Sequence, residues 1–398
     1  MLTNRPFFDN KAVAQRLYQI ALVLLLILSE IFSSNIQSTL PAFSSLFRLG
    51  LSGGAILLLL AKCLLFTHYT SRRQWIVVFA VLAYTGFATV YGGDRWFFFA
   101  ALLALGAKDI DLRATVKLYL AVAAAGLIAV QLLHVFTPLI PFKFYCRNWD
   151  FGYGHYNGYG ARLIGVFFAW AWLRWPKLRW FDWAGLSALM LYTAFVPVCR
   201  GAAGAMILLL LLFLLQKLIP SFFECKVWHG LVLAIWPVLT AASLACGYFF
   251  DTANPEATPI LFKISRLLSG RFEIWHNVFW QKSASLFGGL PTDGDEHTSI
   301  DNMYLALPMN KGVLGAILVA VVFLLLLWRL CKNGHTCETL CLAALLCYCL
   351  MENKPFLLAA NPFLLLFPCI FFWPADGALP ALAPIPISSK RSSKVSDS

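Results

Sequence analysis

The chain is dominated by apolar stretches, most of them long enough to cross a lipid bilayer, for which a helix needs about 20 apolar residues. With 60% apolar and only 13% charged residues, the chain of 398 residues could not cover the surface of a soluble globule. We therefore predict an all-α fold, a polytopic transmembrane helical bundle of about 12 spans. The stretches lie at residues 17–34, 46–66, 75–91, 114–136, 158–175, 182–198, 201–219, 228–250, 312–331, 338–352 and 356–373, with a shorter one at 96–107.

The positions of the basic residues indicate how these spans are oriented. If the N-terminus lies in the cytoplasm, every cytoplasmic loop carries at least two Lys or Arg residues, as the positive-inside rule expects. The net charge of +12 then reflects topology and not a nucleic-acid partner. The residues that define the cytoplasmic side are Arg5, Lys11, Arg16, Arg72, Arg73, Lys108, Arg113, Lys117, Arg174, Lys177, Arg179, Lys217, Lys226, Arg329, Lys332, Lys390, Arg391 and Lys394.

This orientation divides the chain into a single transmembrane domain, residues 1–373, and a cytoplasmic tail, residues 374–398. The tail is rich in Pro, Ser, Ala and Lys, so we predict that it is disordered. Two longer segments, 137–157 and 251–303, are predicted to lie on the extracytoplasmic side. Most of the polar residues that topology does not explain fall in these segments and in two short outer turns.

The first outer segment ends in a loop of alternating glycines and aromatic residues, Phe151-Gly-Tyr153-Gly-His155-Tyr-Asn157-Gly-Tyr-Gly160, followed by Arg162. Glycines allow the backbone to approach a ligand closely, and the aromatic rings offer flat faces that could stack on sugars. An aromatic belt at the level of the lipid headgroups is the alternative interpretation.

Two of the arginines on the predicted outer side, where the positive-inside rule disfavours basic residues, begin predicted helices. Arg200 begins a span and is followed by small residues that let a neighbouring helix approach. Arg271 begins the second of two short amphipathic helices, predicted around 259–268 and 271–279 with a break at Ser-Gly. Both guanidinium groups could bind a diphosphate, and the alternative is that they reach lipid headgroups.

The acidic residue Asp301 precedes a span, where a carboxylate is costly unless it is paired or used. The alternative role for Asp301 is a helix N-cap. In the last outer turn, Glu352 lies two residues from Lys354, and a mutual salt bridge would explain both. The acidic cluster at 293–296 is predicted to be a solvated loop.

Four fragments of the chain together resemble the O-antigen polymerase and ligase superfamily, the Wzy-type polysaccharide polymerases and their ligase relatives. They occur between residues 154 and 312, in the order in which that family carries them. The fragments are Gly-His-x-Asn-x-x-Gly at 154–160, Arg-Gly-Ala at 200–202, Ser-Gly-Arg-x-x-Ile-Trp at 269–275, and Asp-Asn-x-Tyr-Leu with a following glycine at 301–312.

The resemblance implies a metal-independent membrane glycosyltransferase of the GT-C type that needs no cofactor. It would polymerise undecaprenyl-diphosphate-linked oligosaccharides for O-antigen, capsule or exopolysaccharide, at the outer face of a bacterial cytoplasmic (inner or plasma) membrane. Membrane lipids, a flippase and a chain-length regulator would be its partners. Ligases of the superfamily carry a His where this chain has Asp301, which favours the polymerase.

The resemblance also implies which residues form the site. Arg200 and Arg271 would stabilise the charge of the diphosphate in place of a metal. Either Asp301 or His155 would orient or deprotonate the acceptor hydroxyl, and the sequence leaves the choice open. The residues expected to bind substrate are Tyr153, Asn157, Arg162, Trp275, Asn302 and Tyr304.

Three alternatives remain from the sequence alone. A ligase-like enzyme would transfer the glycan to a different acceptor. A transporter or flippase of lipid-linked sugars would need polar residues along a path through the bilayer, whereas the unexplained polar residues here gather at the outer face. A structural membrane subunit would tolerate exchange of its arginines for lysine.

Overall fold

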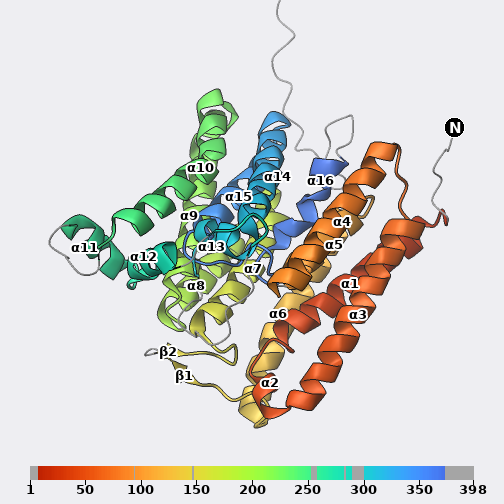
Figure 1. Cartoon of the computed structure of the whole chain (residues 1–398), viewed down its shortest axis with the longest axis horizontal. Helices are drawn as coiled ribbons and strands as arrows, with labels where there is room; N and C mark the ends of the chain where they lie inside the picture. Colours follow the sequence, from red (N-terminus) through yellow and green to blue (C-terminus); the bar gives the residue numbers. More distant parts are fainter. Residues whose placement is uncertain are drawn as a thin grey trace, which may run out of the picture.

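The computed structural model describes residues 8–93, 95–145, 148–251, 258–281, 284–288 and 300–372. The tail predicted at 374–398 and the acidic cluster at 293–296 lie outside these residues. The described chain is helical apart from its connections and one short hairpin, in which β1 (Phe144–Tyr145) pairs antiparallel with β2 (Asn148–Trp149). Figure 1 shows the arrangement of the helices. The helices are α1 (Lys11–Glu30), α2 (Ile36–Thr39), α3 (Pro41–Leu65), α4 (Arg72–Gly92), α5 (Arg95–Gly106), α6 (Leu112–Phe136), α7 (Tyr156–Arg174), α8 (Trp180–Phe195), α9 (Arg200–Leu218), α10 (Lys226–Phe249), α11 (Pro259–Leu267), α12 (Arg271–Gln281), α13 (Met303–Asn310), α14 (Gly312–Lys332), α15 (Thr336–Tyr348) and α16 (Pro368–Phe371), with 3-10 turns η1 (Trp175–Lys177), η2 (Pro220–Glu224) and η3 (Pro362–Leu366).

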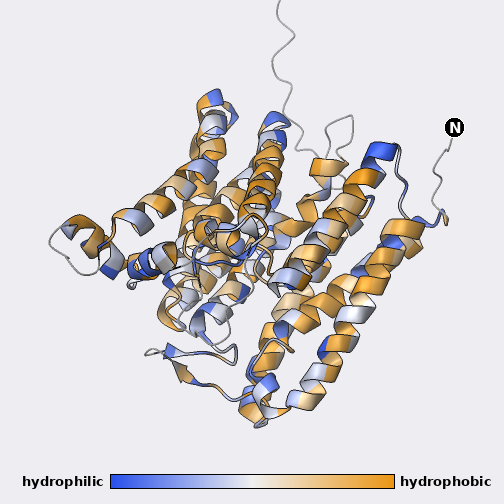
Figure 2. Ribbon diagram, in the orientation of Figure 1, coloured by the Kyte–Doolittle hydropathy of each residue, from blue (hydrophilic) through white to orange (hydrophobic). Residues whose placement is uncertain are grey.

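Seven of the described helices are long and apolar enough to cross a membrane, namely α1, α3, α4, α6, α9, α10 and α14. Apolar side chains on their outer surfaces are well exposed, for example Ile76 at 66% and Phe79 at 56% on α4, as expected for helices that face lipid. In Figure 2, α4 and α14 are apolar along most of their visible length, and the upper ends of α4, α10 and α14 are hydrophilic. The structure thus confirms the prediction of a helical protein with several segments suited to a membrane.

Local sequence signals fix where the helices begin and end. Helix α4 starts after Ser71, whose hydroxyl accepts a hydrogen bond from the Gln74 N–H, and it stops at Gly93, which adopts a left-handed φ of 71°. Helix α6 starts after Asp111, whose carboxylate accepts from the Ala114 N–H. The two short helices predicted around 259–268 and 271–279 are present as α11 and α12. Between them Ser269 (φ 63°) and Gly270 (φ 79°) turn the chain, as the Ser-Gly break predicts.

The last stretch predicted as a span, 356–373, is not a continuous helix. Residues 351–361 are non-helical, and only η3 and α16 follow. Prolines at 355, 362 and 368 remove helix donors, which explains the break. The segment is nevertheless deeply buried, with Leu358, Ala359 and Ala360 all at 0% exposure. Non-helical backbone is tolerated at such depth only where other protein groups satisfy it.

Those protein groups come from the neighbouring helix α6 and from the segment itself, and a second helix, α7, packs closely against it. The Tyr119 hydroxyl of α6 donates to the carbonyls of Leu358 (2.8 Å) and Ala359 (3.0 Å). The Asn361 amide donates to the Pro355 carbonyl at 2.7 Å. On α7, a Cβ at Gly165 would lie 1.8 Å from the Ala359 oxygen, so only glycine allows this approach. The segment therefore lies in the interior of the helical bundle.

Candidate functional site

The guanidinium group of Arg271, the first residue of α12, joins three segments that are far apart in the sequence. Its Nη1 lies 3.2 Å from Asp301 Oδ2, and its Nη2 lies 2.9 Å from Glu352 Oε1. It also donates a hydrogen bond to the carbonyl of Met351. The Arg271 side chain is 11% exposed, the Glu352 side chain 5% and the Asp301 side chain 29%. We call these three side chains the Arg271 cluster.

Asp301 is not the N-cap of α13, so that alternative is wrong. The cap is Asn302, whose side-chain oxygen accepts from the N–H groups of Tyr304 (2.8 Å) and Leu305 (3.3 Å). The Asn302 amide also donates to the Ser243 hydroxyl of α10 at 2.8 Å. Because Asn302 does the capping, the Asp301 carboxylate is left for Arg271, and it is the most exposed member of the cluster.

Glu352 also differs from its expected role, because it forms its ion pair with Arg271 and not with Lys354. Burial, together with the negative charge of Asp301, raises the pKa of Glu352 to about 7. The positive charges of Arg271 and Lys354 act in the opposite direction. Sequence reasoning did not place Glu352 in the site. The available signal was an acidic residue directly after an apolar stretch, at the outer end of a predicted span.

Arg200, the first residue of α9, lies at the border of the same cluster. It is exposed, and its Nη1 donates to the Leu267 carbonyl at the end of α11, at 3.4 Å. The next residue, Gly201, packs against Met351, since a Cβ there would lie 3.2 Å from the Met351 Cβ. Arg200 thus begins a helix that packs on the turn whose carbonyl binds Arg271.

His155 is the N-cap of α7, and its Nδ1 accepts a hydrogen bond from the Asn157 N–H at 3.0 Å. Burial lowers the pKa of His155, and the positive charges of Lys354 and Arg271 lower it further, while Asp301 acts in the opposite direction. The ring is therefore neutral at neutral pH. With Nδ1 accepting, the neutral ring carries its proton on Nε2.

The start of α7 is fastened to the start of α9, which brings the glycine-rich loop toward the cluster. The Cys199 thiol donates to the Tyr156 carbonyl at 2.9 Å. A Cβ at Gly160 would lie 2.6 Å from the Cys199 sulfur, so the close contact requires glycine. Asn157 is half-buried at this helix start. The loop glycines therefore serve helix packing as well as backbone freedom.

Arg162 forms a second ion pair, away from the Arg271 cluster. Its Nε lies 3.3 Å from Glu30 Oε2, and its two terminal nitrogens donate to the carbonyls of Gly158 and Ser29, both at 2.7 Å. Its guanidinium carbon lies 4.0 Å from the centre of the Tyr153 ring, and the Tyr153 hydroxyl donates to Glu30 at 3.4 Å. These contacts fasten α7 to the end of α1.

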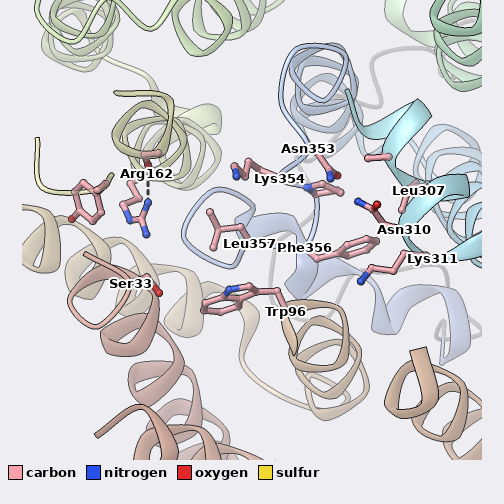
Figure 3. Close-up of a pocket in the computed structure, with 14 residues that line it drawn as sticks. Ser33, Trp96, Arg162, Leu307, Asn310, Lys311, Asn353, Lys354, Phe356 and Leu357 are labelled. Atoms are coloured by element: carbon pink, nitrogen blue, oxygen red, sulfur yellow. Dashed lines mark hydrogen bonds between the residues drawn. The ribbon is translucent and has the colours of Figure 1, made fainter. Parts of the chain in front are cut away.

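A cavity of about 350 Å³ lies next to Arg162 and Tyr153. Figure 3 shows its lining residues, which include Trp96 of α5, Asn310 at the end of α13, and Lys354 in the turn that follows Glu352. The cavity therefore lies next to the Arg271 cluster in the chain, because residues 353–357, which directly follow Glu352, line it. Two of the residues predicted to bind substrate, Tyr153 and Arg162, line this cavity.

Three of the other residues predicted to bind substrate, Trp275, Asn302 and Tyr304, occupy packed positions. Trp275 is 1% exposed and packs with Phe250 and Phe272. Tyr304 is 3% exposed, and its hydroxyl donates to the Leu346 carbonyl at 3.0 Å. With Asn302 at 0%, these three side chains shape the surroundings of the Arg271 cluster through packing.

The described residues contain no group of three or more His, Cys, Asp or Glu side chains that could hold a metal ion. Comparison of the whole chain with known proteins found no matching family model, no similar curated protein and no similar solved structure.

Proposed function

We propose that the protein is a polymerase of undecaprenyl-diphosphate-linked oligosaccharide repeat units, acting at the outer face of a bacterial cytoplasmic membrane. About 12 membrane segments of GT-C type would carry the site. One observation supports the proposal most: the four fragments that resemble the polymerase family come from different parts of the chain, and contacts or charges link each of them to the Arg271 cluster or to the turn beside it.

In the Arg271 cluster the guanidinium cation is held in place, and no single carboxylate occupies all of its hydrogen-bond donors. Arg271 faces two carboxylates, and a diphosphate would bind the same planar donor group. Glu352 is nearly buried and stays as the fixed partner, whereas Asp301 is the more exposed one. A diphosphate at Arg271 therefore displaces Asp301 more readily than Glu352.

Displacement of Asp301 would link substrate binding to proton transfer. In the reaction, the acceptor hydroxyl oxygen attacks the anomeric carbon of the donor sugar, and the bond from that carbon to the diphosphate oxygen breaks. The lipid diphosphate leaves with the electron pair, stabilised by Arg271, and the hydroxyl proton passes to the Asp301 carboxylate. The base is assigned to Asp301 over His155 because His155 Nδ1 already accepts the Asn157 N–H.

Reconstituted turnover tests this function. The purified chain in liposomes is given labelled lipid-linked repeat units and no other acceptor, and the products are separated by size. A ladder of species that remain on lipid diphosphate is expected. Single repeat units that move only to an added non-lipid acceptor would indicate a ligase. Movement of the lipid-linked sugar across the bilayer without any new linkage would indicate a transporter.

A further inference from the structure

Helix α11 presents an apolar strip that no part of the described chain covers. Ile260, Ile264 and Leu267 recur at the spacing of one helix face, and they are 71%, 40% and 72% exposed. Another side of the helix is used within the protein, where the Ser265 hydroxyl accepts a hydrogen bond from the Phe272 N–H of α12 at 3.2 Å. The apolar strip therefore faces away from the protein.

Two basic residues flank this strip. Helix α11 contains Lys263 and Arg266 and no acidic residue, and both basic side chains are exposed. Neither forms an ion pair with a residue of the described chain, and the Arg266 guanidinium carbon lies 5.0 Å from the centre of the Phe262 ring. Apolar side chains flanked by basic ones are typical of helices that lie in the plane of a membrane surface.

The surroundings of α11 place it at the level of a bilayer surface. The helix follows α10, which is long and apolar enough to cross a membrane, and Figure 1 shows α11 at the edge of the molecule where α10 ends. Exposed aromatic side chains lie at this end, namely Tyr248 and Phe249 of α10 and Trp280 of α12, whose ring stacks on Tyr248 with 5.7 Å between the ring centres. Aromatic side chains gather at membrane–water interfaces. The strip on α11 thus continues the lipid-facing surface of α10.

We propose that α11 binds the anionic phospholipid surface of the membrane at the end of α10, which is predicted to be the outer leaflet. The apolar strip enters the acyl region, and Lys263 and Arg266 contact the phosphates of the headgroups. A second copy of this chain fits the strip less well, because docking through the same face would bring the basic residues of the two copies together.

Helix α11 is joined to the Arg271 cluster through short contacts. The Gly270 N–H, directly before Arg271, donates to the Ser265 carbonyl at 2.7 Å, and Arg200 Nη1 donates to the Leu267 carbonyl at 3.4 Å. Lipid bound at α11 therefore holds the cluster close to the level of the headgroups. This lipid binding goes beyond the proposed function and does not depend on which reaction the cluster carries.

Photocrosslinking of the full-length chain in lipid nanodiscs tests this inference. The photoreactive amino acid p-benzoylphenylalanine takes the place of Leu267, and the nanodiscs contain phosphatidylglycerol and phosphatidylcholine in equal amounts with the same acyl chains. Mass spectrometry after irradiation identifies the attached lipids. We expect lipid adducts in which phosphatidylglycerol is favoured about tenfold. With the photoreactive residue at Phe79, an exposed position within α4, lipid adducts should form without this preference.

Charge variants separate contact with headgroups from general contact with lipid. Lys263→Gln combined with Arg266→Gln should remove the preference, whereas Lys263→Arg combined with Arg266→Lys should keep it, because headgroup phosphates accept either cation. Arg95→Gln combined with Lys143→Gln removes the same charge from exposed residues elsewhere on the predicted outer side and should also keep it. Lipid adducts at Phe79 in each variant establish that the protein has folded and inserted.

Three results would overturn the inference. Crosslinks from Leu267 to a second copy of the chain would make the strip a contact between copies, and the absence of lipid adducts there would show that the strip does not enter the bilayer. A phosphatidylglycerol preference that equals the one at Phe79, or that persists in Lys263→Gln combined with Arg266→Gln, would contradict binding to anionic headgroups. Each of these results is independent of whether the chain makes polymer.

Discussion

Of the three arginines that pair with acids in the described chain, Arg162 and Arg271 lie in two sites that are built differently. Arg162 faces one carboxylate, Glu30, and their side chains are 5% and 1% exposed. Arg271 faces two carboxylates, and one of them, Asp301, is 29% exposed. The first pair is closed by backbone carbonyls and an aromatic ring, which suits a permanent fastening. The second has a partner that can be exchanged, which suits binding of an anionic substrate.

The largest expected effect is on the stability of the protein, when the Arg162–Glu30 pair is broken. Arg162→Met leaves Glu30 buried without its ion-pair partner, which should lower the free energy of unfolding by about 3–5 kcal/mol. Thermal unfolding followed by intrinsic fluorescence measures the change, with Arg200→Met at an exposed arginine as the control. Adding Glu30→Gln to Arg162→Met should restore much of the loss. If Arg162→Met unfolds like the control, the two sites do not differ as described.

At the Arg271 cluster, a substitution should lower turnover and leave stability almost unchanged. Arg271→Lys keeps the charge but loses the planar pair of donors, so we expect turnover of lipid-linked repeat units to fall about 10²–10³-fold. The unfolding temperature should stay close to that of the unmodified protein. Arg266→Lys, at an exposed arginine of α11, is the matched control and should keep full turnover. Normal turnover in Arg271→Lys would indicate that Arg271 has only a structural role, like that of Arg162.

Asp301→Asn separates a base from a structural group. Because Asn302 caps α13, the change at Asp301 should leave stability almost unaltered, while turnover falls about 10²-fold through loss of the proton acceptor. Asn302→Ala provides the opposite pattern, with stability lowered by about 1 kcal/mol through loss of the cap. Asp301→Asn protein that still makes a full ladder would exclude Asp301 as the base.

The smallest expected effect concerns pH. Since the pKa of Glu352 is raised to about 7, its carboxylate is ionised mainly above that pH, and it then holds Arg271. Turnover should therefore fall about tenfold between pH 8 and pH 6. In Glu352→Gln, turnover should no longer fall between pH 8 and pH 6. If the pH profile of this variant keeps its slope, Glu352 is not the group that causes the pH dependence.

The stability contribution of Glu352 has the opposite sign. Its folded pKa lies above the ordinary value of 4.5, so the folded state favours the protonated form. That contribution is present at low pH and is lost as the pH rises through about 7. Turnover and this part of the stability should thus change in opposite directions.

The sequence predicts the local features of this protein well because they have local causes. Apolar length marks most of the helices, and a Ser-Gly pair marks the break between α11 and α12. No local signal identified Glu352 as a partner of Arg271, since the two residues lie 81 positions apart in the sequence. In the sequence, Lys354 is the obvious ion-pair partner for the Glu352 carboxylate. Only the packing of α12 on this turn shows that its partner is Arg271.

The candidate site was predictable in part for the same reason. Arg271 and Asp301 stood out because charge on the outer side needs an explanation. Lys354 was assigned to a salt bridge with Glu352 and Lys311 was not considered, since the cavity that both residues line exists only once α5, α7 and α13 are assembled. Trp275 and Tyr304 matched a motif, yet their aromatic side chains are used for packing.

The buried non-helical segment has a consequence for how the protein is made. During synthesis it leaves the ribosome after α6 and α7, whose Tyr119 and Gly165 receive it. A segment with unpaired carbonyls is a poor substrate for direct insertion into lipid, so it has to wait until those helices are in place. Membrane integration of the chain should therefore finish with a docking step between finished helices. Gly165→Leu, which blocks the docking surface, should leave the earlier helices inserted while the C-terminal segment becomes accessible to protease.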